Sequence, residues 1–135
     1  MGPSTMQAKI EWSGGLQFYG DMGGRQIELD GDARTGCTPM ELLTISLAGC
    51  MAIDVVHILG KMRAGLKSVT ARVEGTRAET EPHRFTKLNL YFDVGGSDLS
   101  AAQVERAIAL SKEKYCSVYH SLRTDMKIAI TFAVV

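Results

Sequence analysis

Hydrophobic and polar residues alternate along six short stretches of the chain, and such alternation is typical of half-buried strands. In the first stretch Met6, Ala8, Ile10 and Trp12 share one face, while polar residues occupy the other. Glycine-rich turns separate the first three stretches. The alternation predicts strands over residues 6–12, 16–20, 25–30, 68–79, 86–94 and 126–135.

One long segment breaks this alternation. Residues 42–59 are apolar on nearly every side, which indicates a buried helix. Thr38, Pro39 and Glu41 mark its start, because they form a capping-box sequence with proline at the first helical position. We expect the helix to continue to about Met62.

A second capping-box sequence, Ser100-x-x-Gln103, predicts another helix over residues 101–115. A short further helix is expected over residues 116–123. The whole order is then βββ-α-ββ-α(α)-β, an α+β domain built on antiparallel strands. We expect residues 6–135 to form this single domain and residues 1–5 to be a flexible end that cloning could have added.

The apolar character of the central helix bears on oligomeric state. A helix that is apolar all round must be covered on all sides, and one chain of 135 residues offers a single sheet to lay against it. A second copy of the chain could supply the rest. We therefore predict a two-fold homodimer with this helix near the interface.

Composition narrows the class of partners. The 15 Lys and Arg residues balance 15 Asp and Glu residues without a basic block, so we expect no nucleic-acid surface. Asp54 and His57 argue against a membrane span, since ionisable groups are costly in hydrocarbon. The first residues do not resemble a signal peptide, and a cytoplasmic location is expected.

The three cysteines are Cys37, Cys50 and Cys116. They show no Cys-x-x-Cys spacing and no histidine at zinc-site spacing, so no metal site is expected. Cys37 and Cys50 would be separated by more than three helical turns, too far for a disulfide, and only Cys116 could join either one. Three unrelated buried thiols remain an alternative. Cys116 is expected at a helix start, where backbone N–H groups favour a thiolate.

Two motifs together resemble a known superfamily. "GCTPMELLTISLAGCMAIDVV" (residues 36–56), followed by "SKEKYCSVYHSL" (residues 111–122), resembles the OsmC/Ohr superfamily of osmotically inducible protein C and organic hydroperoxide resistance proteins. The resemblance covers essentially the whole chain and implies the OsmC-like fold as an intertwined homodimer with active sites at the interface. It further implies a thiol peroxidase for organic hydroperoxides in oxidative stress defence, with Cys50 as the peroxidatic and Cys116 as the resolving cysteine.

The resemblance also implies an activating Arg–Glu pair, and here the chain departs from the family pattern. The family glutamate follows the helix proline directly, whereas here Met40 intervenes and Glu41 comes next. The family arginine follows Gly-Gly in the first hairpin, where this chain has Leu16. Arg34 is slightly favoured over Arg25 as the replacement. Glu41 and Arg34 are therefore the further candidate catalytic residues.

The remaining expectations concern what the site would use. The family reductant is a dithiol, often lipoyl-type, and no cofactor is expected. Leu47, Met51 and Ile53 would line an apolar substrate pocket. Asp54 is expected to pair with His57 or with a neighbouring segment. Two rival functions are a non-catalytic binding protein for an apolar small molecule and a Cys-dependent acyl hydrolase, which would need a histidine within reach of Cys50.

Overall fold

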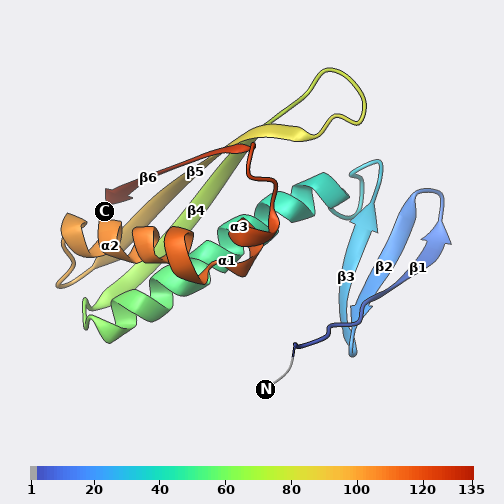
Figure 1. The fold of residues 1–135 in the computed structure, drawn as a ribbon. Helices are drawn as coiled ribbons and strands as arrows, with labels where there is room; N and C mark the ends of the chain where they lie inside the picture. The colour runs from blue at the N-terminus through green and yellow to red at the C-terminus, as the bar shows by residue number, and fades with distance from the viewer. Residues whose placement is uncertain (1–2) are drawn as a thin grey trace. The chain divides into compact units, whose positions relative to one another are not determined.

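The computed structural model describes residues 3–135, which form two compact units. The first ends at Leu43 and the second runs from Thr44 to Val135. The elements follow one another in the order β1-β2-β3-α1-β4-β5-α2-η1-α3-β6, which confirms the predicted α+β order; Figure 1 labels all of them except η1. Residues 3–5 of the predicted flexible end are exposed and without regular structure, and residues 1–2 lie outside the described residues.

The first unit is a three-stranded antiparallel sheet. Strands β1 (Lys9–Gly14), β2 (Gln17–Met22) and β3 (Arg25–Asp30) lie in the order β1-β2-β3. Gly15 and Gly23 stand in the two turns with φ of 54° and 64°, a left-handed conformation that glycine adopts without strain.

The second unit holds a mixed sheet in the order β4-β5-β6, formed by β4 (Leu66–Arg77), β5 (Phe85–Gly96) and β6 (Lys127–Val134). Strands β4 and β5 are antiparallel, but β6 runs parallel to β5, so the prediction of antiparallel strands throughout was wrong for the last strand. The helices between β5 and β6 carry the chain back to the starting edge of the sheet, and a strand that follows such a crossover must be parallel.

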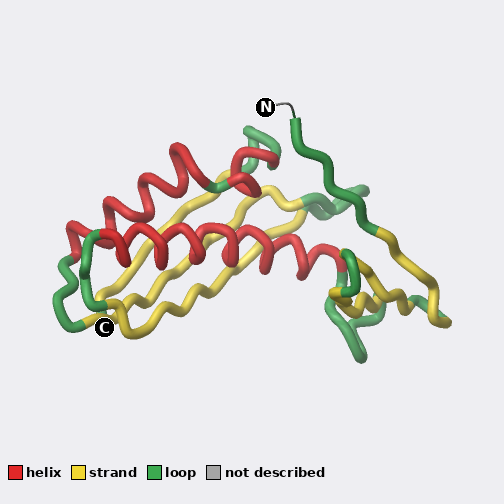
Figure 2. Tube along the Cα trace, turned by 90° about the horizontal axis from the view of Figure 1, so that it is seen from below, coloured by secondary structure: helices red, strands yellow, loops and turns green. Residues whose placement is uncertain are grey.

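Helix α1 (Pro39–Lys61) begins in the first unit and continues through the second. In the second unit it runs along the sheet together with α2 (Ala101–Leu110), as Figures 1 and 2 show. The π-helical turn η1 (Ser111–Tyr115) and the short helix α3 (Ser117–Ser121) follow α2.

The core of the second unit lies between α1 and the sheet. Leu47, Met51, Val55 and Leu59 recur every four residues along one face of α1 and are fully buried. The inward face of β5, predicted from its alternation, is buried as well and consists of Leu88, Leu90, Phe92 and Val94. These two rows form the main apolar contact that holds the unit together.

The opposite face of α1 remains uncovered in the single chain. Ile45, Ile53 and Val56 are 56%, 70% and 46% exposed. The single sheet of one chain therefore covers one side of the helix, as expected from the sequence. The helix is long and apolar enough to cross a membrane by length and composition, a test that the core helix of a globular protein also passes.

Both predicted capping boxes are confirmed. The Thr38 N–H donates to Glu41 Oε1 at 2.8 Å, and the Glu41 N–H donates to Thr38 Oγ1 at 3.2 Å. Ser100 and Gln103 make the same reciprocal pair at the start of α2. These side chains satisfy N–H groups that the first helical turn leaves without partners.

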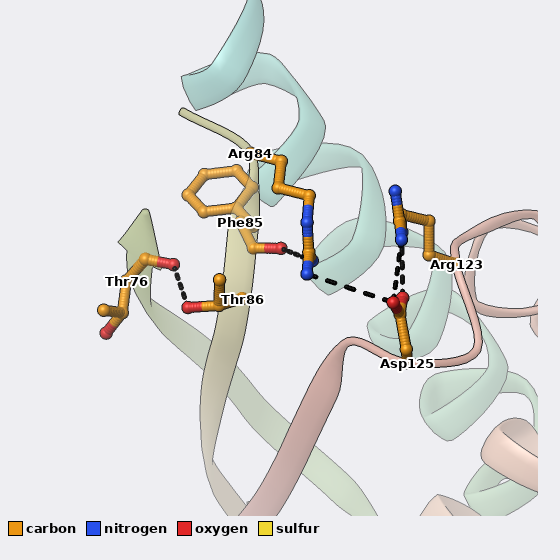
Figure 3. Close-up of polar contacts among 6 residues, drawn as sticks. All are labelled: Thr76, Arg84, Phe85, Thr86, Arg123 and Asp125. Carbon is orange, nitrogen blue, oxygen red and sulfur yellow. Dashed lines mark hydrogen bonds and ion pairs between the residues drawn. The ribbon is translucent and has the colours of Figure 1, made fainter. Parts of the chain in front are cut away.

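An ion-pair cluster at the start of β5 secures the return of the chain into β6. Arg123 donates two hydrogen bonds to the Asp125 carboxylate, at 2.8 and 2.7 Å, and Arg84 approaches the same carboxylate at 3.9 Å (Figure 3). These contacts hold the pKa of Asp125 down, at about 2, chiefly through the hydrogen bonds from Arg123. The cluster therefore ties the segment after α3 to the residues that lead into β5.

Candidate dithiol site

The second unit brings two of the three cysteines together. Cys50 is half-buried on α1, and Cys116 is fully buried at the start of α3. Their sulfur atoms and a carboxylate oxygen of Asp54 all lie within 4.8 Å of one another. The two thiols are separate, not joined in a disulfide. Residues 66 positions apart in sequence thus form one dithiol cluster with a carboxylate beside it.

The π-helical turn η1 sets the position of Cys116. Its backbone N–H donates to the Ser111 carbonyl at 2.8 Å, a bond that spans five residues instead of the four of an α-helix. Ser111 at the start of this turn is buried, whereas Tyr115 at its end is 50% exposed. Turns of this kind inside helices are frequent at functional sites.

The sequence left two hydrogen-bond partners open for Asp54, either His57 or a neighbouring segment. In the structure the partner comes from the neighbouring segment. The Ser111 hydroxyl donates to Asp54 Oδ2 at 2.8 Å and is itself fully buried. Ser111 is not among the residues predicted from the sequence. Its signal was its spacing, because it follows Val104 and Ile108 at the interval that keeps residues on one helical face. A polar residue on an apolar face needs a partner, and Asp54 provides it.

Burial raises the pKa of the Cys116 thiol to about 11. The Tyr119 N–H donates to its sulfur at 3.3 Å and acts in the opposite direction, while the nearby Cys50 and Asp54 raise the pKa further. The expectation that the helix start would favour a thiolate was therefore wrong for Cys116. The five-residue helix α3 provides one such N–H bond. The stabilisation of the thiolate by this bond is smaller than the free-energy cost of charging a buried sulfur that lies beside Cys50 and Asp54.

Glu41 and Arg34, the other two candidate catalytic residues, belong to the first unit. Glu41 has the capping role already described. Arg34 is exposed and lies in a loop organised by the buried Asp30, whose carboxylate accepts N–H bonds from Asp32, Arg34 and Thr35. These hydrogen bonds lower the pKa of Asp30. Cys37 also belongs to this loop region, since its carbonyl accepts from the Asp30 N–H. The catalytic roles of Glu41 and Arg34 remain predictions.

The expected pocket lining was wrong in two of three positions. Leu47 and Met51 are fully buried in the core, whereas Ile53 lies on the uncovered face of α1 and lines a cavity there with Val56 and Val69. A cavity of about 430 Å³ instead reaches the dithiol cluster through Asp54. Its other lining residues are His57, Ile58, Lys61, Met62, Leu110 and Tyr115.

With the site described, the chain can be compared with known proteins. The family model of OsmC-like protein matches residues 30–131. The chain belongs to this family. It is 42% identical over 132 residues to Protein YhfA of Escherichia coli K12, which covers 96% of this chain and 98% of that protein.

Solved structures of the family share the fold. A crystal structure of a hypothetical protein from Aquifex aeolicus VF5 is 27% identical, with a TM-score of 0.90 and 98% coverage of both chains. A Legionella pneumophila protein, described as an organic hydroperoxide resistance protein OsmC, has a TM-score of 0.70 at 19% identity and covers 99% of this chain and 100% of its own.

Proposed function

We propose that this protein is a thiol-dependent peroxidase that reduces organic hydroperoxides through a cycle of Cys50 and Cys116. The observation that carries the proposal is the dithiol cluster, in which the two sulfur atoms lie within 4.8 Å of each other. A disulfide requires the sulfurs to approach to about 2.05 Å, a short movement for two side chains.

The two cysteines differ in a way that supports different roles for them. Cys50 is half-buried, which makes this residue more accessible to a peroxide than Cys116, which is fully buried. The raised pKa of Cys116 keeps that thiol protonated at neutral pH, and a protonated thiol is a poor nucleophile. Cys50 is therefore the sulfur that attacks first, and Cys116 acts in the second step.

The cycle then has three balanced steps. The Cys50 thiolate attacks the peroxide, the O–O bond breaks, and the alkoxide takes a proton to leave as an alcohol, with Cys50 oxidised to a sulfenic acid. The Cys116 thiol displaces water from that sulfenic acid and forms the disulfide. An external dithiol, of lipoyl or similar type, reduces the disulfide by exchange and is itself oxidised.

The cavity beside the cluster supports an organic substrate. Ile58, Met62, Leu110 and Tyr115 give it an apolar wall next to Asp54. An apolar wall favours binding of the carbon chain of an organic hydroperoxide. Hydrogen peroxide has no apolar surface to bury and gains no such binding energy.

We propose further that the active protein is a homodimer. The uncovered face of α1 carries Ile45, Ile53 and Val56, and a contiguous exposed apolar surface of this kind marks an interaction site. Within the proposed dimer, Glu41 and Arg34 would activate Cys50. A cytoplasmic location fits the free state of all three cysteines.

Mass spectrometry after one equivalent of an organic hydroperoxide tests the proposal, with hydrogen peroxide in parallel. We expect the mass to fall by two hydrogens, mapped to a Cys50–Cys116 disulfide, and to fall faster with the organic peroxide. Cys50→Ser should abolish the reaction, and Cys116→Ser should stop it at the Cys50 sulfenic acid. Thiols that remain reduced at equimolar peroxide would exclude a peroxidase and leave the binding-protein alternative, for which the cavity beside Asp54 is the place to look for a ligand.

The acyl hydrolase alternative has less support. A Cys-dependent hydrolase needs a histidine that hydrogen-bonds its nucleophile. Among residues 44–135, the one histidine ring with a hydrogen bond is that of His83, which contacts the Ala78 carbonyl. His57 and His120 make no such bond to Cys50.

A further inference from the structure

The dithiol cluster contains three metal-binding side chains, although the cysteine spacing had predicted no metal site. Cys50, Asp54 and Cys116 each place a donor atom within 4.8 Å of the other two. They come from α1 and from the start of α3. The fold creates a donor set here that the linear sequence conceals, because the donors are spread over 67 residues.

The spacing of the donors suits a tetrahedral ion. With Zn–S bonds of about 2.3 Å, two sulfurs of a tetrahedral site lie about 3.8 Å apart, and a carboxylate oxygen lies slightly closer. No two donor atoms of the cluster are more than 4.8 Å apart, so their separations exceed this spacing by at most about an ångström. Side-chain rotation closes such a gap without movement of the helices.

The donor types select the metal. Two sulfurs with one carboxylate oxygen favour a borderline-soft ion such as Zn²⁺ and disfavour Mg²⁺ and Ca²⁺, which take oxygen ligands. The cluster also lacks a protein cation. Among residues 44–135, no Lys or Arg forms an ion pair with Asp54.

Hydrogen bonds from outside the cluster hold the donors in place. Ser111 donates to Asp54 Oδ2 at 2.8 Å, which leaves the other lone pairs of the carboxylate for an ion. The Tyr119 N–H donates to the Cys116 sulfur at 3.3 Å. Such outer partners orient the ligands in metal sites and tune their affinity.

We propose that the reduced cluster of Cys50, Asp54 and Cys116 binds one Zn²⁺ ion per chain, with solvent or a small thiol as the fourth ligand. Binding displaces one proton from each thiol, so the affinity rises with pH. A disulfide between Cys50 and Cys116 removes both sulfur ligands. The same two thiols therefore hold zinc only while they are reduced.

The test is a competition for Zn²⁺ between the full-length protein and the chromophoric chelator 4-(2-pyridylazo)resorcinol. We expect the reduced protein to take one Zn²⁺ per chain. Cys50→Ser and Cys116→Ser should each weaken binding by at least about 100-fold, since outer-sphere changes alone cost 10–100-fold. Asp54→Asn should weaken binding by at least about 10-fold, and Ser111→Ala by about 10-fold.

Two controls keep the result interpretable. Asp98→Asn removes a carboxylate from the loop before α2 and should leave zinc affinity unchanged. Diamide oxidises the unmutated protein, taking two electrons and two protons from the thiols as it becomes a hydrazine, and should release the bound Zn²⁺. Circular dichroism confirms that each variant is folded. Wild-type binding no tighter than that of the Cys50→Ser/Cys116→Ser double variant would overturn the proposal, and so would an unchanged affinity in Asp54→Asn.

The zinc proposal and the peroxidase proposal can fail separately. Zinc affinity is measured without peroxide, and the hydroperoxide reaction is measured on protein freed of metal by a chelator. Zinc binding without any reaction with hydroperoxide would support the zinc site and contradict the peroxidase proposal. A reaction with hydroperoxide without zinc binding would support the peroxidase proposal and contradict the zinc site.

Discussion

The two sheets of this protein share one hydrophobic pattern but differ in what covers it. In β5 of the second unit, the apolar residues Leu90 and Phe92 are 0% and 1% exposed, because α1 and α2 pack against that sheet. In β1 of the first unit, Ile10 and Trp12 alternate just as regularly and are 63% and 65% exposed. The same period-2 pattern therefore produced a core in one sheet and an apolar surface in the other.

The difference teaches what alternation measures. It identifies the face of a strand that is selected to avoid water, but it does not identify the segment or the second chain that covers that face. In the first unit, Ile27 pairs with Gly20, the partner of Ile10, so it lies on the same face of the sheet as Ile10 and Trp12, and it is 48% exposed. Together with the uncovered face of α1, this surface is the physical basis for the proposed homodimer.

The largest effect is expected where the alternating face is covered within the chain. Phe92→Ala should lower the free energy of unfolding by about 3–5 kcal/mol, because it removes a fully buried ring from the central strand of the second sheet. Urea unfolding followed by circular dichroism measures the loss. Asp93→Ala, on the exposed face of the same strand, is the matched control and should change the stability by less than about 0.5 kcal/mol. Equal effects at the two positions would contradict the assigned faces.

A second substitution addresses the uncovered sheet. Trp12→Lys should weaken dimer association by at least about tenfold, since large aromatic residues dominate interface energies. Sedimentation velocity over a range of concentrations measures the dissociation constant. Glu11→Lys introduces the same charge on the opposite face of β1 and should leave association unchanged. A dimer of unaltered strength in Trp12→Lys would show that this face of the first sheet is not part of the interface.

The sequence predicted the elements well because local signals define them. The capping boxes at Thr38 and Ser100 located two helix starts correctly. The direction of β6 was predicted wrongly, because alternation is identical in parallel and antiparallel strands. The π-helical turn that places Cys116 was not predicted either, since one extra residue in a helical turn leaves no compositional signal.

The candidate site was predicted in part, for a related reason. Two motifs indicated Cys50 and Cys116, but their proximity depends on how α1 packs beside the crossover helices. Ser111 was not predicted, because its role comes from a hydrogen bond to Asp54, which lies far from it in the sequence. Local pattern thus identifies reactive residues more readily than it identifies the partners that tune them.

The third prediction concerns this tuning within the second unit. Asp54→Asn should lower the pKa of Cys116 from about 11, because it removes a negative charge that disfavours the thiolate. The rate of iodoacetamide alkylation, followed against pH by mass spectrometry in Cys37→Ser/Cys50→Ser protein with a chelator present, reports the titration of Cys116 alone. Ser111→Ala is the matched control, since it removes the hydrogen bond to Asp54 but retains the charge, and there the pKa should stay raised. If Asp54→Asn also left the pKa raised, burial alone would account for it.

The smallest effect is expected at the exposed ion-pair cluster beside β5. The folded-state pKa of Asp125, about 2, lies below its ordinary value of 3.8, so ionised Asp125 stabilises the fold at higher pH. This contribution is fully present above about pH 4 and is lost as the pH falls towards 2. The melting temperature of Asp125→Asn should therefore lie slightly below that of wild type at pH 5, and the difference should close by pH 2. Arg123→Gln should remove most of this pH dependence, because the Arg123 guanidinium makes both short hydrogen bonds to the carboxylate. A difference between wild type and Asp125→Asn that persists unchanged at pH 2 would mean that Asp125 acts through packing and not through its charge.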